Sequence, residues 1–277
     1  MRTEANLSTT KARPMRVGDF PPEISFYYPA RKTLPISLTG QNCFLNCGHC
    51  CGHYLKSMSQ PGDCTTFAKY KSFLISGGFS REGRLPITEH EFFLKKLSRY
   101  GKLNFHTGFL SAEDIRLLQL LANCVSLELF GDKETIAVVN GLNRGPEDYF
   151  DVYLKLKRMN VPVVPHICIG VKKGKISGEK NIIDFLAQHP PEKITLLIFR
   201  PTQATPFGIY QPPAVEESLE IIAYAKKRLP YTKVYLGCMR PGGRYRARLD
   251  PLAVKAGING IVMPSPGAKQ KALELGL

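Results

Sequence analysis

Short apolar runs alternate with amphipathic segments along most of the chain, and this alternation constrains the fold more than any other feature. Apolar or alternating runs read as strands at 34–38, 72–76, 102–107, 125–130, 161–169, 193–199, 233–237 and 258–263. Apolar residues recur every three to four positions at 88–100, 111–124, 145–160, 178–189 and 214–229, which predicts helices. Strands that alternate with helices pair in parallel, so we expect an α/β fold, a (β/α)8 TIM-type barrel. An open six-stranded partial barrel with two added units is the alternative.

The chain is expected to form one domain. Its 277 residues, 43% of them hydrophobic, suit one large α/β core, and no linker-like stretch divides them. We predict a barrel over residues 33–277 and an N-terminal extension over 1–32 that packs on it. Residues 1–31 mix charges with proline and contain no apolar run, so we expect a cytoplasmic protein without membrane contact. Helix start signals precede acidic first turns at Thr88, Ser111 and Pro146.

The net charge of +15 indicates an anionic partner of some kind. The chain has 38 Lys and Arg against 23 Asp and Glu. Such a surface attracts nucleic acid, anionic cofactors or an acidic protein equally well. The basic residues are spread along the chain and Trp is absent, so no dense array of Arg and aromatic residues exists to grip RNA. We therefore disfavour nucleic acid as the partner.

Four of the eight cysteines lie within residues 43–51, directly after the first predicted strand. In a reducing compartment, clustered cysteines are more often metal ligands or catalytic groups than disulfides. Cys43, Cys47 and Cys50 could hold three corners of an iron-sulfur cluster and leave its fourth iron open for a substrate. A closed zinc site would need a second C-x2-C pair, which the chain lacks. A redox dithiol would leave Cys43 and Cys51 unexplained.

The segment "CFLNCGHC" after a barrel strand resembles the radical S-adenosylmethionine (SAM) superfamily. The resemblance implies that Cys43, Cys47 and Cys50 are the catalytic residues and the metal ligands. They would hold a [4Fe-4S] cluster whose open iron is chelated by SAM. It also implies that His49, just before the third cysteine, leans on the adenine of SAM; an ordinary loop histidine is the alternative.

Further segments match superfamily motifs in their order along the chain. "ISGG" places Gly77 and Gly78 where backbone groups meet the methionine amine, although Phe79 replaces the usual acidic residue and an ordinary Gly-Gly turn competes. Glu128 stands where a polar side chain meets the ribose hydroxyls. "CIGV" places Ile169 and Gly170 where backbone edges bind adenine, and residues 200–207, "RPTQATPF", resemble the strand-six segment.

"YLGCMRPGG" and "GINGIVMPSPGA" extend the resemblance to the biotin synthase-like branch. Sulfur-inserting members of that branch carry a second iron-sulfur cluster, which donates sulfide. Biotin synthase itself holds it with interior residues whose places here are taken by Ile75, Asn104, Val164 and Tyr235. Biotin synthase activity is therefore not expected.

Other thiols could hold a second cluster. We expect Cys168 and Cys238 at the barrel mouth and name them as candidate ligands, with His166 on the same strand face as Cys168. Cys124 is expected to end a helix as a packed core thiol. Cys51 and Cys64 lie in the loop after the first cluster and are either metal ligands or spectators.

Within the branch, "SLTGQNCFLNCGHCCGHYL" is most similar to the archaeal-type two-component lipoyl synthases. The resemblance implies sulfur insertion into a protein-bound octanoyl chain through a 5′-deoxyadenosyl radical. The expected partners are an acidic octanoylated lipoyl carrier, a sister radical SAM subunit and a reductant such as ferredoxin. Two alternatives stay open: a radical SAM enzyme that rearranges an amino acid or matures a metallocofactor, and a basic zinc-binding nucleic-acid module.

Overall fold

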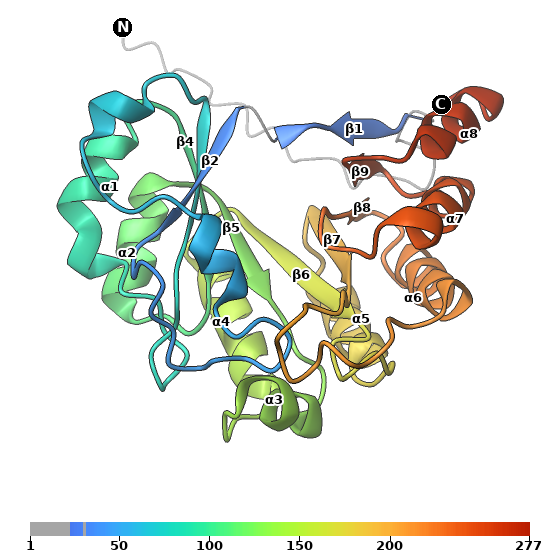
Figure 1. Ribbon diagram of the computed structural model, residues 1–277, viewed down its shortest axis with the longest axis horizontal. Coiled ribbons are helices and arrows are strands. Elements are labelled where there is room, and N and C mark those ends of the chain that lie inside the picture. The colour runs from blue at the N-terminus through green and yellow to red at the C-terminus, as the bar shows by residue number, and fades with distance from the viewer. Residues whose placement is uncertain (1–22, 30–31) are drawn as a thin grey trace, which may run out of the picture.

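Nine parallel strands form a single sheet that curves into an open half-barrel (Figure 1). The computed structural model describes residues 23–29 and 32–277. The sheet has the order β1-β9-β8-β7-β6-β5-β4-β3-β2. The strands are β1 (Ser25–Tyr27), β2 (Thr33–Ser37), β3 (Ser72–Ser76), β4 (Lys102–Thr107), β5 (Ala122–Glu128), β6 (Val163–Ile169), β7 (Lys193–Ile198), β8 (Lys233–Leu236) and β9 (Gly260–Val262). The predicted α/β class, parallel pairing and single domain are confirmed, and each of the eight predicted runs overlaps a strand.

The sheet is open because its two end strands, β1 and β2, do not pair within the described residues. The barrel is therefore a half-barrel. β1 lies in the segment 1–32 that was expected to be an extension, and Ser25 pairs with Gly260 of β9 in parallel. Residues 1–22 and 30–31 of that segment lie outside the described residues, so its predicted packing remains a prediction.

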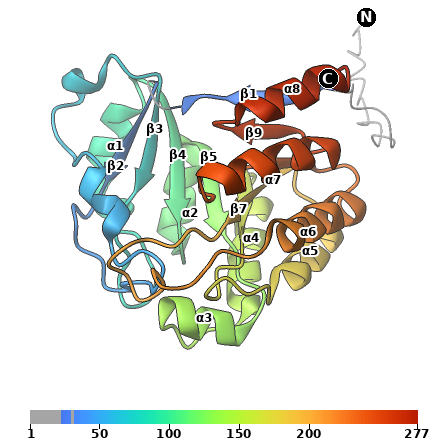
Figure 2. The same ribbon diagram turned by 45° about the vertical axis from the view of Figure 1, so that its right-hand side comes forward.

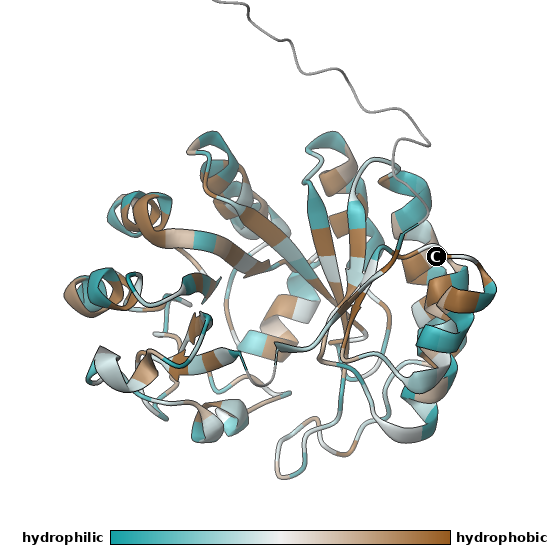
Figure 3. Cartoon of the chain, turned by 90° about the horizontal axis from the view of Figure 1, so that it is seen from above, coloured by the Kyte–Doolittle hydropathy of each residue, from teal (hydrophilic) through white to brown (hydrophobic). Residues whose placement is uncertain are grey.

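Eight α-helices in the described residues cover the convex side of the sheet (Figure 2). They are α1 (Glu91–Leu97), α2 (Ala112–Leu121), α3 (Lys133–Asn140), α4 (Pro146–Arg158), α5 (Glu179–Gln188), α6 (Val215–Arg228), α7 (Gly243–Lys255) and α8 (Pro266–Glu274). Short 3-10 helices are η2 (His53–Ser57), η3 (Cys64–Phe67) and η4 (Thr88–His90). Seen from above, the helices surround the strands and turn hydrophobic residues toward them (Figure 3). None of the helices in the described ranges is long and apolar enough to cross a bilayer.

Alternation along each strand divides the sheet into a helix-side core and a concave face. On β6, Ile167 and Ile169 are buried in the core shared with the helices. His166 and Cys168 alternate with them and therefore face the concave side. Ile75 is fully buried in the helix-side core, so its expected place in the barrel interior is wrong. Because side chains alternate along a strand, the residues directly before and after Ile75 on β3 face the concave side instead.

Local signals explain where several helices begin. The Ser111 hydroxyl accepts a hydrogen bond from the Asp114 N–H at 3.1 Å, and the Asp114 carboxylate accepts one from the Ser111 N–H, which makes a capping box for α2. Pro146 is the first residue of α4, where its missing N–H costs nothing. Thr88 instead opens only the 3-10 turn η4, and α1 begins after His90 without a side-chain cap.

Cys124 lies on a strand, and the prediction that it ends a helix is wrong. Helix α2 stops at Leu121 and β5 begins at once with Ala122. Cys124 is half-buried and pairs with Asn104 of β4. The apolar pattern of the helix runs without a break into that of the strand, so the pattern alone gives no sign of the change.

Candidate active site

The cysteine loop leaves the carboxyl end of β2, at the edge where parallel barrels place their chemistry. Its entry is tied to the neighbouring strand by the Leu38 N–H, which donates to the Ser76 carbonyl at 2.8 Å. The chain then winds through one turn, in which the Cys50 N–H donates to the Cys47 carbonyl at 3.0 Å. Cys43, Cys47 and Cys50 are all free and half-buried. A loop with its own internal hydrogen bonds can hold three thiols in a fixed arrangement.

Two distant segments clamp the loop at Gly48. Its N–H donates to the Val139 carbonyl of α3, and its carbonyl accepts from the Phe207 N–H, both at 2.9 Å. A Cβ at Gly48 would lie 2.5 Å from a ring carbon of Phe207. Glycine is therefore required between the second and third cysteines. Phe207 belongs to the segment 200–207 that matched a superfamily motif, and the structure gives that segment a packing role.

Gly77 and Gly78 support the same loop from the end of β3. The Gly78 N–H donates to the Thr39 hydroxyl at 2.6 Å. A Cβ at Gly78 would lie 1.8 Å from the Asn42 carbonyl oxygen and 2.5 Å from the Cα of Cys43. The pair is thus needed for close packing against the first cysteine. Its predicted contact with the methionine amine stays a prediction, and the Gly78 N–H is already engaged.

The cysteine thiols act on one another electrostatically. Burial, followed by the charges of Cys50, Cys43 and Glu128, raises the pKa of Cys47 well above its ordinary value. Burial is also the largest cause that raises the pKa of Cys50 to about 11. The thiols of Cys47 and Cys50 would not ionise together unless a cation joined them, and bound iron deprotonates its thiol ligands. The donor set therefore fits an iron-sulfur cluster.

The three thiols are not arranged as the ligands of one metal ion. Within the described ranges, no group of three or more His, Cys, Asp or Glu side chains converges as a single-ion site requires. In an iron-sulfur cube each cysteine binds a different iron, so the sulfurs need not meet at one point. The lack of a single-ion site in the described ranges is therefore consistent with the cluster hypothesis.

Glu128 ends β5 and faces the concave side, as predicted. Burial raises its pKa to about 7. Its charge in turn raises the pKa of Cys47, Cys50 and Cys168, so it lies within electrostatic reach of all three. No described residue donates a hydrogen bond to its carboxylate. The side chain is half-buried, so its carboxylate is open on the concave face to a ligand with hydroxyl or N–H groups.

His49 carries a second polar atom without a partner. Its Nδ1 is buried and no described residue bonds to it. Burial lowers the pKa of His49 to about 4, so the ring is neutral near pH 7. Polar atoms at buried positions usually have a hydrogen-bond partner. The orphaned nitrogen beside Cys50 is therefore a second sign that the site accommodates a further group.

Ile169 and Gly170 end β6 with their backbone groups largely engaged. The Ile169 carbonyl accepts from the Phe199 N–H at 2.8 Å. The Gly170 N–H donates to the Glu179 carboxylate at 2.7 Å. Gly170 has φ +73° and a Cβ there would lie 2.8 Å from Pro213, so glycine is required. The predicted adenine contact stays a prediction, and the Gly170 N–H is not free to make it.

A pair of histidines on the concave face was not predicted as a pair. The rings of His106 on β4 and His166 on β6 meet edge to face, with centroids 5.4 Å apart. Burial lowers the pKa of His106 to about 4, and burial together with His106 lowers that of His166 to about 3. Next to them, Ser126 donates to the Asn104 side-chain carbonyl at 3.1 Å. Strand alternation combined with the order of parallel strands was the signal that could have found them.

The candidate ligands of a second cluster lie on different parts of the edge. Cys168 stands on the concave face of β6, and burial and Glu128 raise its pKa. Cys238 is exposed in the loop after β8, with β7 between the two strands. Cys51 points its thiol at the Asn46 and Cys47 carbonyls, at 3.7 and 3.6 Å. Cys64 begins η3, and its side chain lies outside the description.

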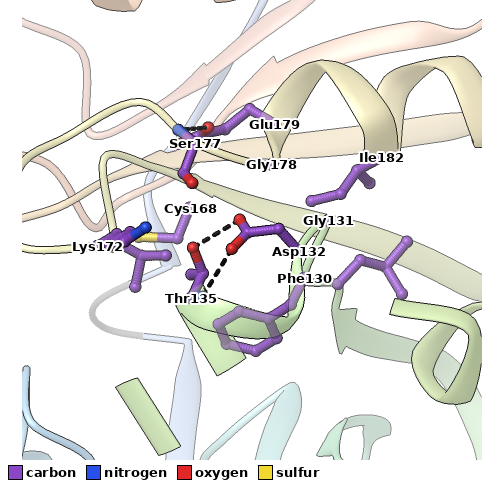
Figure 4. A pocket seen from close by; sticks show the side chains of 12 residues that line it. Phe130, Gly131, Asp132, Thr135, Cys168, Lys172, Ser177, Gly178, Glu179 and Ile182 are labelled. Carbon is purple, nitrogen blue, oxygen red and sulfur yellow. Dashed lines mark hydrogen bonds between the residues drawn. The ribbon is translucent and has the colours of Figure 1, made fainter. Parts of the chain in front are cut away.

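The strand ends beside Cys168 are closed by polar packing (Figure 4). Asp132 accepts from both the N–H and the hydroxyl of Thr135, and the Ser177 N–H donates to Glu179. The hollow between them has only about 10 Å³, enough for one water molecule at most. It supports the wall of the site and is not itself a ligand site.

No protein-family model matches the sequence, and a search of curated proteins gives no match either. Among solved structures, the FeFe-hydrogenase maturase HydG from Carboxydothermus hydrogenoformans is similar, with a TM-score of 0.63 and 14% identity over 87% of this chain and 59% of HydG. Methylornithine synthase (PylB) has a TM-score of 0.63 and 13% identity, over 88% of this chain and 73% of PylB. Streptococcus suis SuiB bound to S-adenosylmethionine has a TM-score of 0.56 and 12% identity, over 78% of this chain and 52% of SuiB.

These likenesses concern the fold. The chain spans less than two thirds of the length of HydG and of SuiB. At 12 to 14% identity, what these structures share with the chain is the arrangement of strands and helices. The chain therefore has the parallel half-barrel fold found in HydG, PylB and SuiB.

Proposed function

We propose that this chain is a radical SAM enzyme. The observation that carries the proposal is the loop after β2, which holds three free, mutually interacting thiols at C-x3-C-x2-C spacing on the carboxyl edge of a half-barrel. One of the solved structures with this fold, SuiB, contains S-adenosylmethionine. A [4Fe-4S] cluster bound there would supply the electron that cleaves SAM.

The chain's own residues would bind, orient and shield the reactants. Cys43, Cys47 and Cys50 would hold the cluster, while Gly48 and Gly78 keep the loop pressed against its supports. The unpartnered carboxyl of Glu128 suits a pair of ribose hydroxyls, since a carboxylate accepts hydrogen bonds from both. The unpartnered His49 Nδ1 suits a polar edge of the cofactor. Both lie where burial strengthens such contacts.

More specifically, we propose sulfur insertion into a protein-bound octanoyl chain, as one component of a two-protein lipoyl synthase. The support is the motif resemblance, together with two thiols near the carboxyl ends of β6 and β8, Cys168 and Cys238, that form no disulfide and are the candidate ligands of a second iron-sulfur cluster. The net charge of +15 suits an acidic carrier domain, because opposite charge speeds encounter. A sister subunit and a reductant such as ferredoxin complete the proposed partners.

A second candidate function is a radical reaction on a small polar molecule. The concave face favours it, because Asn104, His106, Ser126 and His166 present polar groups where an octanoyl chain would prefer apolar ones. PylB, which shares the fold, is named as a methylornithine synthase. An amino acid or a metallocofactor precursor would suit this lining.

Product analysis separates the two candidates. The anaerobically reconstituted protein is incubated with reductant, SAM and an octanoyl-lysine peptide, with and without a sister subunit. Sulfur gain in the peptide supports the lipoyl synthase role. Methionine and deoxyadenosine without sulfur gain favour the small substrate. If SAM remains intact, the radical SAM proposal itself fails.

Variants test the second cluster in the same assay. Under the lipoyl hypothesis, Cys168→Ala and Cys238→Ala each retain SAM cleavage and lose sulfur transfer. Cys124→Ala is the matched control, because this half-buried thiol stands on β5 toward the opposite end of the strand from Glu128. It should retain both activities. Full sulfur transfer in the Cys168 and Cys238 variants would remove these residues from the proposal.

A further inference from the structure

A pocket with no acidic residue in its lining opens at the carboxyl ends of β1, β8 and β9. It lies away from β2 and the cysteine loop that follows it. It has a volume of about 340 Å³ and is lined by Tyr28, Gly243, Arg246, Met263 and Ser265, with Ala247 and two prolines. Helices α7 and α8 begin beside it and pack against each other (Figures 1 and 2). The pocket thus stands where two helix N-termini come together.

Ser265 leaves a buried hydroxyl without a partner. The residue is 7% exposed, and no described residue bonds to its Oγ. Ser265 is the N-cap of α8, where a serine hydroxyl normally accepts a hydrogen bond from the first turn, but no side-chain cap forms. A buried hydroxyl that neither caps its helix nor meets another group is free to bond a ligand in the pocket.

Helix α7 presents an uncapped N-terminus to the same pocket. Its N-cap is Gly242, which has no side chain to cap the helix, and the first turn contains no acidic residue. A Cβ at Gly242 or Gly243 would meet nothing within 4 Å, so the backbone is open to an approaching group. The first N–H groups of a helix lack partners within the helix and carry its positive dipole end. They can therefore donate to an anion.

Arg246 supplies a fixed cation. Its Nη2 donates to the Arg240 carbonyl at 3.1 Å and lies 3.4 Å from the Cys238 carbonyl, which holds the guanidinium in place. Its Nε is buried and no described residue accepts from it. Burial, and then the charge of Arg240, lowers the pKa of Arg246, which marks a positive environment. Lys269 adds a charge near the rim, 5.0 Å from the Tyr28 ring centroid.

The nearest carboxylate is already engaged. Asp250 forms a two-point ion pair with Arg240, with both N–O distances at 2.9 Å, and accepts from the Ser265 N–H at 2.8 Å. Both members of this pair are fully buried. Asp250 therefore neutralises Arg240, and the charge of Arg246 is left for a ligand.

We propose that this pocket binds the phosphate group of a small ligand. A helix N-terminus, a serine hydroxyl and an arginine line the same pocket, and this number of donors suits the several oxygens of a tetrahedral oxyanion better than the two of a carboxylate. Barrels often bind phosphate in the loops after their last two strands, at the N-terminus of a helix. This proposal is independent of the reaction assigned to the cysteine edge.

Phosphate titration of the purified full-length protein tests the proposal. The ³¹P NMR linewidth of inorganic phosphate is followed at constant ionic strength against chloride. Methyl phosphate is followed in a parallel arm, and acetate is titrated as a competitor of bound phosphate. Saturable binding of inorganic phosphate or methyl phosphate, at least tenfold tighter than that of acetate, is expected. The comparison of the two phosphates tells whether the site takes the free anion or an ester. Acetate binding of equal strength would overturn the assignment.

Matched variants test whether phosphate binds in this pocket. Ser265→Ala and Arg246→Gln should each weaken phosphate binding about tenfold, because each removes a hydrogen bond to a charged group. Arg248→Gln is the control, since Arg248 lies on the same helix, is exposed and pairs with Glu216. It should leave binding unchanged. Thermal unfolding shows whether each variant is folded. If Arg246→Gln does not fold, Ser265→Ala alone tests the pocket. The proposal is refuted if phosphate does not bind saturably, or if both pocket variants bind phosphate as tightly as the wild type.

Discussion

Two buried histidines on the concave face make stability depend on pH. The folded-state pKa values of His106 and His166 are lowered to about 4 and about 3. Between those values and the ordinary value near 6.5, the unfolded chain takes up protons that the folded chain does not. We predict that stability is full above about pH 6.5 and falls as the pH drops toward 4. Each histidine should account for roughly 2 kcal/mol, since the open concave face reduces the effect.

Urea denaturation at pH 7 and pH 4 measures this effect. The double variant His106→Gln, His166→Gln should lose less stability between the two pH values than the wild type. His90→Gln, on η4 outside the sheet, is the matched control and should behave as the wild type. If the double variant retains the full pH dependence, the histidine pair is not its source.

Gly78 is predicted to be irreplaceable for the cysteine loop. A Cβ there would lie 1.8 Å from a backbone carbonyl, which cannot move aside as a side chain can. Gly78→Ala should therefore destabilise the protein by about 3 kcal/mol and reduce its iron content. Gly62→Ala is the control, because the described atom nearest to its Cβ would be the Gln60 carbonyl oxygen, at 4.0 Å. Thermal unfolding and iron analysis check both, and an unchanged Gly78→Ala protein would show that the loop is not packed as described.

At the residue level, the sequence could predict which residues lie in one loop, but it could not predict contacts between side chains on separate strands. Cys43, Cys47 and Cys50 lie in one loop, so the sequence alone could predict that the three thiols share the same part of the molecule. Glu128 was named from the motif resemblance, and alternation along β5 explains why it faces the concave side. His106 was missed because its meeting with His166 depends on β5 lying between their strands. That neighbour relation comes from tertiary pairing.

Among the elements, helix α2 offers a direct test of a sequence signal. Its capping box joins Ser111 and Asp114, and Asp114 also pairs with Arg84 at 2.8 Å. Ser111→Ala should lower the free energy of unfolding by about 1 kcal/mol. Urea denaturation measures the change, with Ser98→Ala as the control, since its hydroxyl only bonds the Lys95 carbonyl one turn back. An equal loss in both variants would mean that the capping box adds nothing specific.

Elements with strong apolar periodicity were predicted, and those without it were missed. The sequence predicted β2 to β9 and five of the helices. Helix α7 was missed because Pro251 lies inside it and charged residues interrupt its apolar face. Helix α3 is short and rich in β-branched residues, which favour strands. β1 has three residues, and its strand state depends on pairing with β9. Pairing partners of this kind cannot be read from a local pattern.

At the scale of the whole molecule, the Arg240 and Asp250 pair ties the last strands together. Arg240 also donates to the Gly237, Val262 and Met263 carbonyls, which lie at the ends of β8 and β9. Asp250→Asn would leave the arginine charge buried without a counter-charge. We predict a loss of about 3–5 kcal/mol, measured by urea denaturation. The exposed pair of Arg248 and Glu216 is the control, and Glu216→Gln should cost less than 1 kcal/mol. Similar costs for both would contradict the anchoring role.

The proposed chemistry of the whole molecule depends on the cluster at the carboxyl edge, and iron analysis tests for this cluster most directly. Iron and acid-labile sulfide are measured in anaerobically prepared wild type and in Cys43→Ser, Cys47→Ser and Cys50→Ser, with Cys124→Ser as the control. We predict about four irons per chain or more in the wild type and the control, with about four lost in each loop variant. A wild type without iron, or loop variants that retain as much iron as the wild type, would contradict the account.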